Sequence, residues 1–140
     1  MSTEQNKAVV RRFVEEVLNK GNLALTGELF ASDYTNYGFG PPFGREGFAA
    51  VIGQFHSAFP DLRITIENMI AEGDRVVIRG TARGTHRGEF NGIPPTGKQI
   101  TVPLMTEYRL TNGKIVEDRP LIDMSGLLQQ IGAVPALARP

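Results

Sequence analysis

The stretch ITVPLMTEYRLTNGKIVEDRPLI, residues 100–122, predicts a β-hairpin made of two long strands that meet at one tight turn. Residues 100–110 place apolar side chains mostly at every second position, the period of a strand. Asn112-Gly113 is the strongest short-range hairpin signal, because a type I′ turn requires positive φ at both central residues. We expect residue 111 opposite 114, 110 opposite 115, and so on along the pair.

This register divides the hairpin between two faces. The second face would place Glu107 opposite Asp118, an unfavourable pair of like charges unless that face is solvated or lies at a subunit interface. Pro103 and Pro120 would lie near each other, which argues for a bulge or a sheet edge. The first and more apolar face would carry Ile100, Val102, Leu104, Thr106, Tyr108, Leu110, Ile115, Glu117, Arg119, Leu121 and Asp123.

Asp123 is the candidate catalytic residue on this apolar face. It would lie opposite Val102 and beside Leu104 and Leu121, so a carboxyl group would enter aliphatic surroundings. Desolvation there would raise its pKa and make it a usable general base or acid near neutral pH. Residue spacing alone favours the alternative that Asp123 caps a helix that follows it.

The rest of the chain predicts an α+β fold. Apolar spacing of three and four residues indicates helices, and alternation indicates a further hairpin. Helices would cover one face of a four-stranded antiparallel meander and leave a pocket between them. The expected segments are helices over residues 3–20, 23–30, 45–59 and 125–131, a Gly/Pro-rich loop over 32–44, strands over 64–70 and 75–83, a loop over 84–97, and a Pro-bounded tail after residue 132.

Composition bounds the chemistry of this 140-residue chain, which we expect to form one domain over residues 1–140. Fifteen Lys and Arg balance fifteen Asp and Glu, which disfavours nucleic-acid binding. The lack of cysteine excludes thiol nucleophiles, iron–sulfur clusters and thiolate zinc sites, and a count of two histidines disfavours an all-imidazole metal site. We expect no metal and no cofactor. The N-terminus is not typical of a signal peptide and no run is long enough for a membrane span, so we expect a cytoplasmic protein.

Further residues are candidates for substrate binding. Tyr34, Asn36 and Tyr37 could direct hydroxyl and amide groups to ligand oxygens, or could simply pack as a lid. His86 lies in a loop, where a solvated histidine is the ordinary case and a position at the pocket mouth is the alternative. The apolar walls are expected from Phe13, Phe55, Phe59, Val102, Leu104, Thr106 and Leu121.

Several local strings, in order along the chain, resemble the SnoaL-like polyketide cyclase (ester cyclase) family of the nuclear-transport-factor-2-like superfamily, over about residues 6–135. The strings are VRRFVEE (10–16), NKGN (19–22), AFPDL (58–62), EGDRV (72–76), GTHRGEF (84–90), GIPPTG (92–97), GKIVE (113–117), and Asp123 with residues 127–132. The resemblance implies a cone-shaped fold, in which N-terminal helices pack in a curved antiparallel sheet that encloses an apolar pocket. It also implies a homodimer formed through the sheet, and cofactor-free catalysis by an aspartate near the end of the last strand. Asp123 matches that position and becomes the leading general acid/base.

Two departures from the family pattern concern the site. Asp118-Arg119 stands where the family usually has His-Trp, and Arg119 could instead bind a carboxylate or carbonyl oxygen of a substrate. Asn36 stands where a histidine is common, and an amide cannot shuttle a proton near pH 7. The functional hypothesis is an aldol-type cyclase or isomerase that acts without cofactor on an apolar, oxygenated small molecule. The alternatives are a non-catalytic ligand-binding or dimerisation module and an epoxide-hydrolase-like activity.

Overall fold

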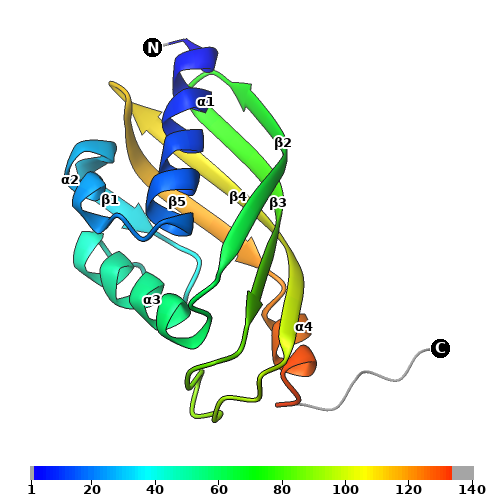
Figure 1. Ribbon diagram of the computed structural model, residues 1–140. Coiled ribbons are helices and arrows are strands. Elements are labelled where there is room, and N and C mark those ends of the chain that lie inside the picture. Colours follow the sequence, from blue (N-terminus) through cyan, green and yellow to red (C-terminus); the bar gives the residue numbers. More distant parts are fainter. Residues whose placement is uncertain (1, 134–140) are drawn as a thin grey trace.

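The structure of the protein is a computed structural model that describes residues 2–133, and it has the expected α+β architecture (Figure 1). The Pro-bounded tail expected after residue 132 lies, from residue 134 on, outside the described residues. No helix within residues 2–133 is long and apolar enough to cross a membrane. The elements are α1 (Thr3–Arg12), continued by a π-helical segment (Phe13–Asn19), a short 3₁₀ turn (Leu23–Leu25), α2 (Thr26–Leu29), β1 (Phe30–Asn36), α3 (Arg45–Ala58), β2 (Arg63–Glu72), β3 (Arg75–Thr85), β4 (Gln99–Thr111), β5 (Lys114–Ile122) and α4 (Met124–Gln130).

The helices begin and end at the residues that the sequence indicates. Ser2 forms a capping box with Gln5, since its hydroxyl accepts from the Gln5 N–H and its own N–H donates to the Gln5 side chain. Gly21 closes the first helical segment with a φ of 72°, a conformation that costs glycine little. Helix α3 ends just before Phe59 and Pro60, as expected. The predicted helices are therefore confirmed to within a few residues.

The sheet has five strands in the order β1-β5-β4-β3-β2, and it is curved and not closed into a barrel. The meander from β2 to β5 is confirmed. The expectation that residues 32–37 form a loop is wrong, because Phe30–Asn36 is a strand that pairs in parallel with β5. Polar residues such as Ser32 and Asp33 face solvent at this sheet edge and conceal the strand pattern. Its partner strand lies far along the chain, so no local pattern reveals the pairing.

The hairpin of β4 and β5 forms as predicted at its turn but not along its length. Asn112 and Gly113 both have positive φ, and Leu110 lies opposite Ile115. A β-bulge then inserts Val116, so that Arg109 lies opposite Glu117. Beyond that point the predicted register is wrong by one residue, which turns every following side chain of β5 to the other face.

The core lies between the helices and one face of the sheet, and α1 crosses that face in Figure 1. Phe13 lies at the centre of an aromatic cluster, with ring centroids 5.4 Å from Phe30, 5.7 Å from Phe48 and 5.8 Å from Tyr108. Phe30 in turn stacks on Tyr34 at 3.7 Å. The cluster joins the first helix, β1, α3 and β4, so it fixes the positions of the elements that surround the pocket described below.

Replacing Gly113 by Ala is expected to destabilise the protein by about 1 kcal/mol, because the residue has a φ of 74° that a Cβ disfavours. Gly53→Ala is the matched control: Gly53 lies in α3, no neighbouring atom lies within 4 Å of the position that a Cβ would take, and the variant should gain ~0.5–1 kcal/mol from helix propensity. Urea unfolding followed by circular dichroism measures both free energies. Equal effects of the two substitutions would contradict the turn assignment.

Candidate active site

An apolar cavity of about 80 Å³ lies between the helices and the sheet. The expected apolar pocket is therefore present. Seventeen of its lining side chains are apolar and four are polar, namely Asn36, Thr106, Tyr108 and Asp118. The apolar lining residues are Phe13, Leu18, Phe39, Phe48, Val51, Ile52, Phe55, Leu62, Ile64, Ile78, Ala82, Ile100, Val102, Leu104, Pro120, Ile122 and Leu127.

Asp118 on β5 is the carboxylate of this cavity. It lies opposite Tyr108 of β4 and beside Asn36 of β1, and it is only 4% exposed. The Tyr34 hydroxyl donates to its Oδ2 at 2.7 Å. Burial raises the pKa of Asp118 to about 7, although the hydrogen bond from Tyr34 acts in the opposite direction. Both protonation states are therefore accessible near neutral pH, as general acid/base chemistry requires.

A directional chain of hydrogen bonds leads to this carboxyl group. The Gly38 N–H donates to Asn36 Oδ1 at 2.9 Å, and Asn36 Nδ2 donates to Tyr34 Oη at 3.2 Å. The Tyr34 hydroxyl in turn donates to Asp118. Burial and the Asp118 charge raise the pKa of Tyr34, so its hydroxyl keeps its proton and remains a donor.

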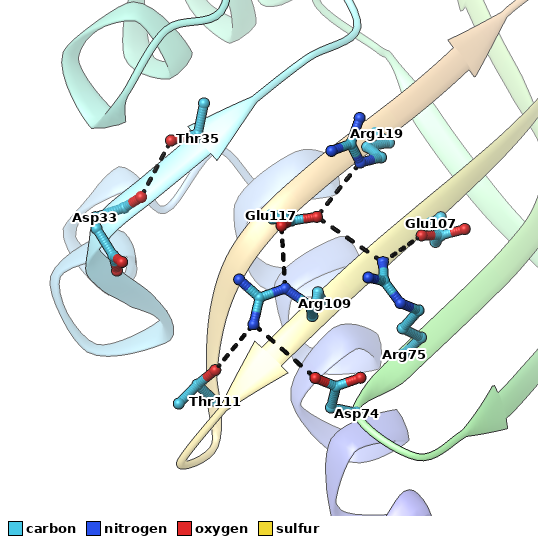
Figure 2. A network of polar contacts seen from close by, with 9 residues as sticks. All are labelled: Asp33, Thr35, Asp74, Arg75, Glu107, Arg109, Thr111, Glu117 and Arg119. Atoms are coloured by element: carbon cyan, nitrogen blue, oxygen red, sulfur yellow. Dashed lines mark hydrogen bonds and ion pairs between the residues drawn. The ribbon is translucent and has the colours of Figure 1, made fainter.

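The neighbouring charged side chains of β4 and β5 point away from the cavity and form a network on the outer face of the sheet (Figure 2). Glu117 accepts from Arg109 at 3.1 Å and from Arg119 at 3.3 Å. Burial acts to raise the pKa of Glu117, but the two arginines lower it by more than burial raises it. The pKa of Glu117 therefore lies below its ordinary value. Because this network lies on the other face, the Tyr34 hydrogen bond is the one interaction among residues 2–133 that offsets the burial of Asp118.

The bulge also removes the like-charge pair expected at Glu107. Glu107 lies opposite Arg119, not Asp118, and its carboxylate pairs with Arg75 at 2.6 Å. The predicted pairing of Glu107 with Asp118 is therefore wrong, and the outer face has alternating opposite charges.

The structure brings half of the predicted substrate-binding residues to the cavity wall. Tyr34 lies behind the wall and acts on the cavity through its bond to Asp118. The predicted residues that line the cavity are Phe13, Asn36, Phe55, Val102, Leu104 and Thr106.

The placement of Asp123 in the pocket is wrong. The Asp123 side chain is exposed and accepts the Gly126 N–H at 2.9 Å, so it caps α4, the alternative role that its spacing favoured. Leu121 is 74% exposed on the outer face of the sheet. Arg119 is exposed too, and its guanidinium stacks 4.1 Å above the ring of Tyr37. The inserted residue Val116 accounts for the turn of β5 that places Arg119 and Leu121 outside.

His86 and Phe59 belong to the packed core, so their expected place at the pocket wall is wrong. Both are fully buried, with ring centroids 5.6 Å apart. His86 Nδ1 accepts from the Thr96 N–H at 3.2 Å, and this bond closes the loop between β3 and β4. His86 is therefore neither solvated nor at the pocket mouth.

Fifteen of the lining residues are not among the predicted substrate-binding residues, and Asp118, Tyr108 and Phe39 are three of them. For Asp118, the sequence signal is the pair Ile115-Val116, two consecutive apolar residues where strand alternation predicts one. Both are buried around the bulge that turns Asp118 into the cavity. Within residues 2–133, no group of three or more His, Cys, Asp or Glu side chains lies close enough to hold a metal ion.

Asp118→Asn is expected to change how stability depends on pH. In the wild type the folded pKa of about 7 lies above the ordinary 3.8, so the folded state holds a proton that the unfolded state releases. The contribution of Asp118 to the free energy of unfolding should then fall by roughly 1 kcal/mol per pH unit as pH rises from about 4 to 7. The stability of Asp118→Asn relative to the wild type should therefore rise with pH over this range, while that of Asp123→Asn should not. Urea unfolding at several pH values tests this, and an unchanged slope in Asp118→Asn would contradict the assignment.

Comparison with known proteins agrees with this geometry. The sequence model of the family described as SnoaL-like polyketide cyclase matches residues 8–131. The chain is 29% identical over 118 residues to nogalonic acid methyl ester cyclase of Streptomyces nogalater, a match that covers 81% of this chain and 88% of the cyclase.

Solved structures show the same fold. AclR of Streptomyces galilaeus, a proposed hydroxylase, superposes with a TM-score of 0.89 at 30% identity, covering 99% of this chain and 87% of AclR. IdmH of Streptomyces antibioticus, a proposed polyketide cyclase, superposes with a TM-score of 0.82 at 33% identity, covering 91% of this chain and 99% of IdmH. These relatives support an enzymatic role. The chain belongs to the SnoaL-like polyketide cyclase family.

Proposed function

We propose that the protein catalyses cofactor-independent proton transfer of the cyclase or isomerase type, with Asp118 as the general base and acid. The observation that carries the proposal is a buried carboxyl group in an apolar cavity, with a pKa of about 7 and one oxygen held by Tyr34. A base with this pKa is matched to removing an acidic C–H proton near neutral pH. The substrate is an apolar molecule that carries a carbonyl group beside that carbon.

In the first step, the Asp118 carboxylate removes the proton, and the C–H electron pair moves into the carbonyl group to give an enolate. Within residues 2–133, no side-chain hydrogen bond reaches Asp118 Oδ1, so this oxygen is the one available to take the proton. Thr106 and Tyr108 line the same end of the cavity as Asp118, and we propose that their hydroxyls donate to the enolate oxygen. Burial keeps the pKa of Tyr108 well above its ordinary value, so it is protonated.

In the second step, the enolate carbon has two possible fates. In an aldol-type cyclisation it attacks a second carbonyl carbon of the same molecule, and protonated Asp118 returns its proton to the new alkoxide. In an isomerisation, a substrate whose enolate is conjugated with a C=C bond takes the proton back from Asp118 at the far carbon of that dienolate, and the double bond moves. Both routes leave the enzyme in its starting protonation state.

The two alternative functions receive less support from the geometry. Epoxide opening by a carboxylate and a second acid would need another acid in the pocket, but Asp118 is the one carboxyl group among the described lining residues and Glu107 lies on the outer face. A non-catalytic ligand-binding module would use the same cavity without turnover, and would leave the raised pKa of Asp118 without a role.

Dimerisation through the sheet remains a prediction, as does a cytoplasmic location. The outer face carries two exposed apolar side chains opposite each other, Met105 at 48% and Leu121 at 74% exposure. Charges of both signs surround them, including Arg119 and Glu107, which suits a face that meets its own copy across a two-fold axis.

Exchange of the α-hydrogens of cyclohexanone for deuterium in D₂O, followed by NMR, tests the proposed function without knowledge of the natural substrate. Catalysed exchange by the wild type should fall at least ~100-fold in Asp118→Asn, because the amide cannot accept the proton. Asp123→Asn is the matched control and should exchange at the wild-type rate, since that side chain is exposed and caps α4. Exchange at the wild-type rate in Asp118→Asn would exclude Asp118 as the general base.

The pH profile of the exchange provides a second test. The rate should rise with pH and reach half of its plateau near pH 7, as Asp118 loses its proton. Tyr34→Phe removes the hydrogen bond that favours the carboxylate, so the midpoint should move to higher pH. Tyr37→Phe should leave it in place, because Tyr37 lies outside the cavity. If the midpoint of the Tyr34→Phe profile is unchanged or lies at lower pH, the proposed effect of the Tyr34 hydrogen bond on Asp118 is contradicted.

A further inference from the structure

We propose that the natural substrate is a compact molecule with one oxygen-bearing end and a hydrocarbon body, and not one that carries oxygens all round its frame. This inference deepens the proposed function and rests on it. The first observation is a gradient of polarity along β4, whose cavity-lining side chains change from apolar to polar along the strand. In chain order they are Ile100, Val102, Leu104, Thr106 and Tyr108.

The neighbouring strands have the same gradient. On β5, polar Asp118 lies opposite Tyr108, whereas apolar Ile122 lies opposite Leu104. On β1, Asn36 lies beside Asp118 and completes the polar end. Since inward residues of one strand are spaced about 6.6 Å apart, the polar groups occupy one end of the cavity and the other lining positions of β4 are hydrocarbon.

The hydrogen bonds already formed limit what the polar end can hold. Asn36 is already committed, because its Oδ1 accepts from Gly38 and its Nδ2 donates to Tyr34. Tyr34 is committed to Asp118. Within the described residues, the capacity left at the cavity wall is the second oxygen of Asp118 and the hydroxyls of Thr106 and Tyr108, which lie within hydrogen-bonding reach of each other and share what they can offer a ligand. These groups can serve oxygens at one end of the ligand, so the second carbonyl that an aldol-type cyclisation needs would have to lie at the same end as the first.

An oxygen elsewhere on the ligand would lose its bonds to water and meet only aliphatic or aromatic carbon. An unpaired buried polar group of this kind weakens binding by about tenfold or more. A polyoxygenated frame would meet this loss at each additional oxygen that enters the apolar part of the cavity.

Size sets the second limit. A cavity of about 80 Å³ holds a few waters or one small ring. Its wall includes Phe39, which packs with its ring centroid 6.0 Å from that of Phe55 and 6.4 Å from that of Phe43. A ligand body larger than a single ring would exceed the space between these walls unless lining side chains such as Phe39 moved.

The test compares cyclohexanone with cyclohexane-1,4-dione, which has the same ring and a second carbonyl at the opposite end. Titrations of the wild type, followed by NMR of methyl groups lining the cavity, should give a dissociation constant at least about tenfold higher for the dione. Because the dione also partitions less well into any apolar site, a variant comparison is needed. Thr106→Val and Tyr108→Phe should each weaken cyclohexanone binding by about tenfold. Thr101→Val, which changes an exposed threonine on the same strand, should not.

Equal affinities for the two ketones, or unchanged cyclohexanone binding in both polar-end variants, would overturn this substrate class. Circular dichroism of each variant identifies any that fails to fold, and the two variants remove different hydroxyls of the same end. Affinities measured with Asp118→Asn separate this inference from the proposed function, since binding selectivity needs no turnover. If Asp118→Asn binds cyclohexanone selectively and also exchanges its hydrogens at the wild-type rate, the proposed substrate class is retained and the catalytic role of Asp118 is excluded.

Discussion

The one-residue bulge at Val116 determines which carboxyl group of the last strand is buried. Because side chains alternate along a strand, an added residue exchanges the two faces of everything that follows it. Asp118 therefore enters the apolar cavity, while Glu117 and Arg119 join the ion-pair network outside. Without the added residue, Asp118 would lie among the outer charges. The polar end of the cavity and the alternating charges of the outer face both depend on this local irregularity.

A buried carboxyl group of this kind has to be supported by the packing around it. The aromatic cluster performs this task, because Tyr34 stacks on Phe30 and its ring meets Phe48 edge-on, which fixes the direction of its hydroxyl toward Asp118. Asn36 and the Gly38 N–H extend the support to the backbone of the following loop. Residues of the core thus set the electrostatics of the site. The burial of Asp118 lowers the stability of the fold at high pH, and the same burial gives Asp118 a pKa suited to proton transfer.

The same arrangement explains how one fold serves relatives with different chemistry. AclR is a proposed hydroxylase and IdmH a proposed polyketide cyclase, yet both superpose closely on this chain. Sheet, helices and apolar cavity form the common frame, and the few inward polar side chains decide the reaction. In this chain the inward polar side chains are four residues at one end of the cavity. The proposed substrate class is therefore inferred from the polarity of the cavity wall and not from the fold.

Local signals in the sequence determined the helices, the Asn112-Gly113 turn, the meander and the capping role of Asp123 as one of two alternatives, since each depends on residues close together in the chain. The apolar pocket and six of its lining residues followed from the same periodicity and the family resemblance. Only the tertiary structure decided that Phe30–Asn36 is a strand, because its partner β5 lies about eighty residues away. It also decided that Asp118, and not Asp123, is the carboxyl group inside. The physical reason is that the facing of each residue in a strand pair depends on every pairing between it and the turn, so a single bulge reverses the orientation of all residues beyond it. In the sequence, only two adjacent apolar residues, Ile115 and Val116, indicate this bulge.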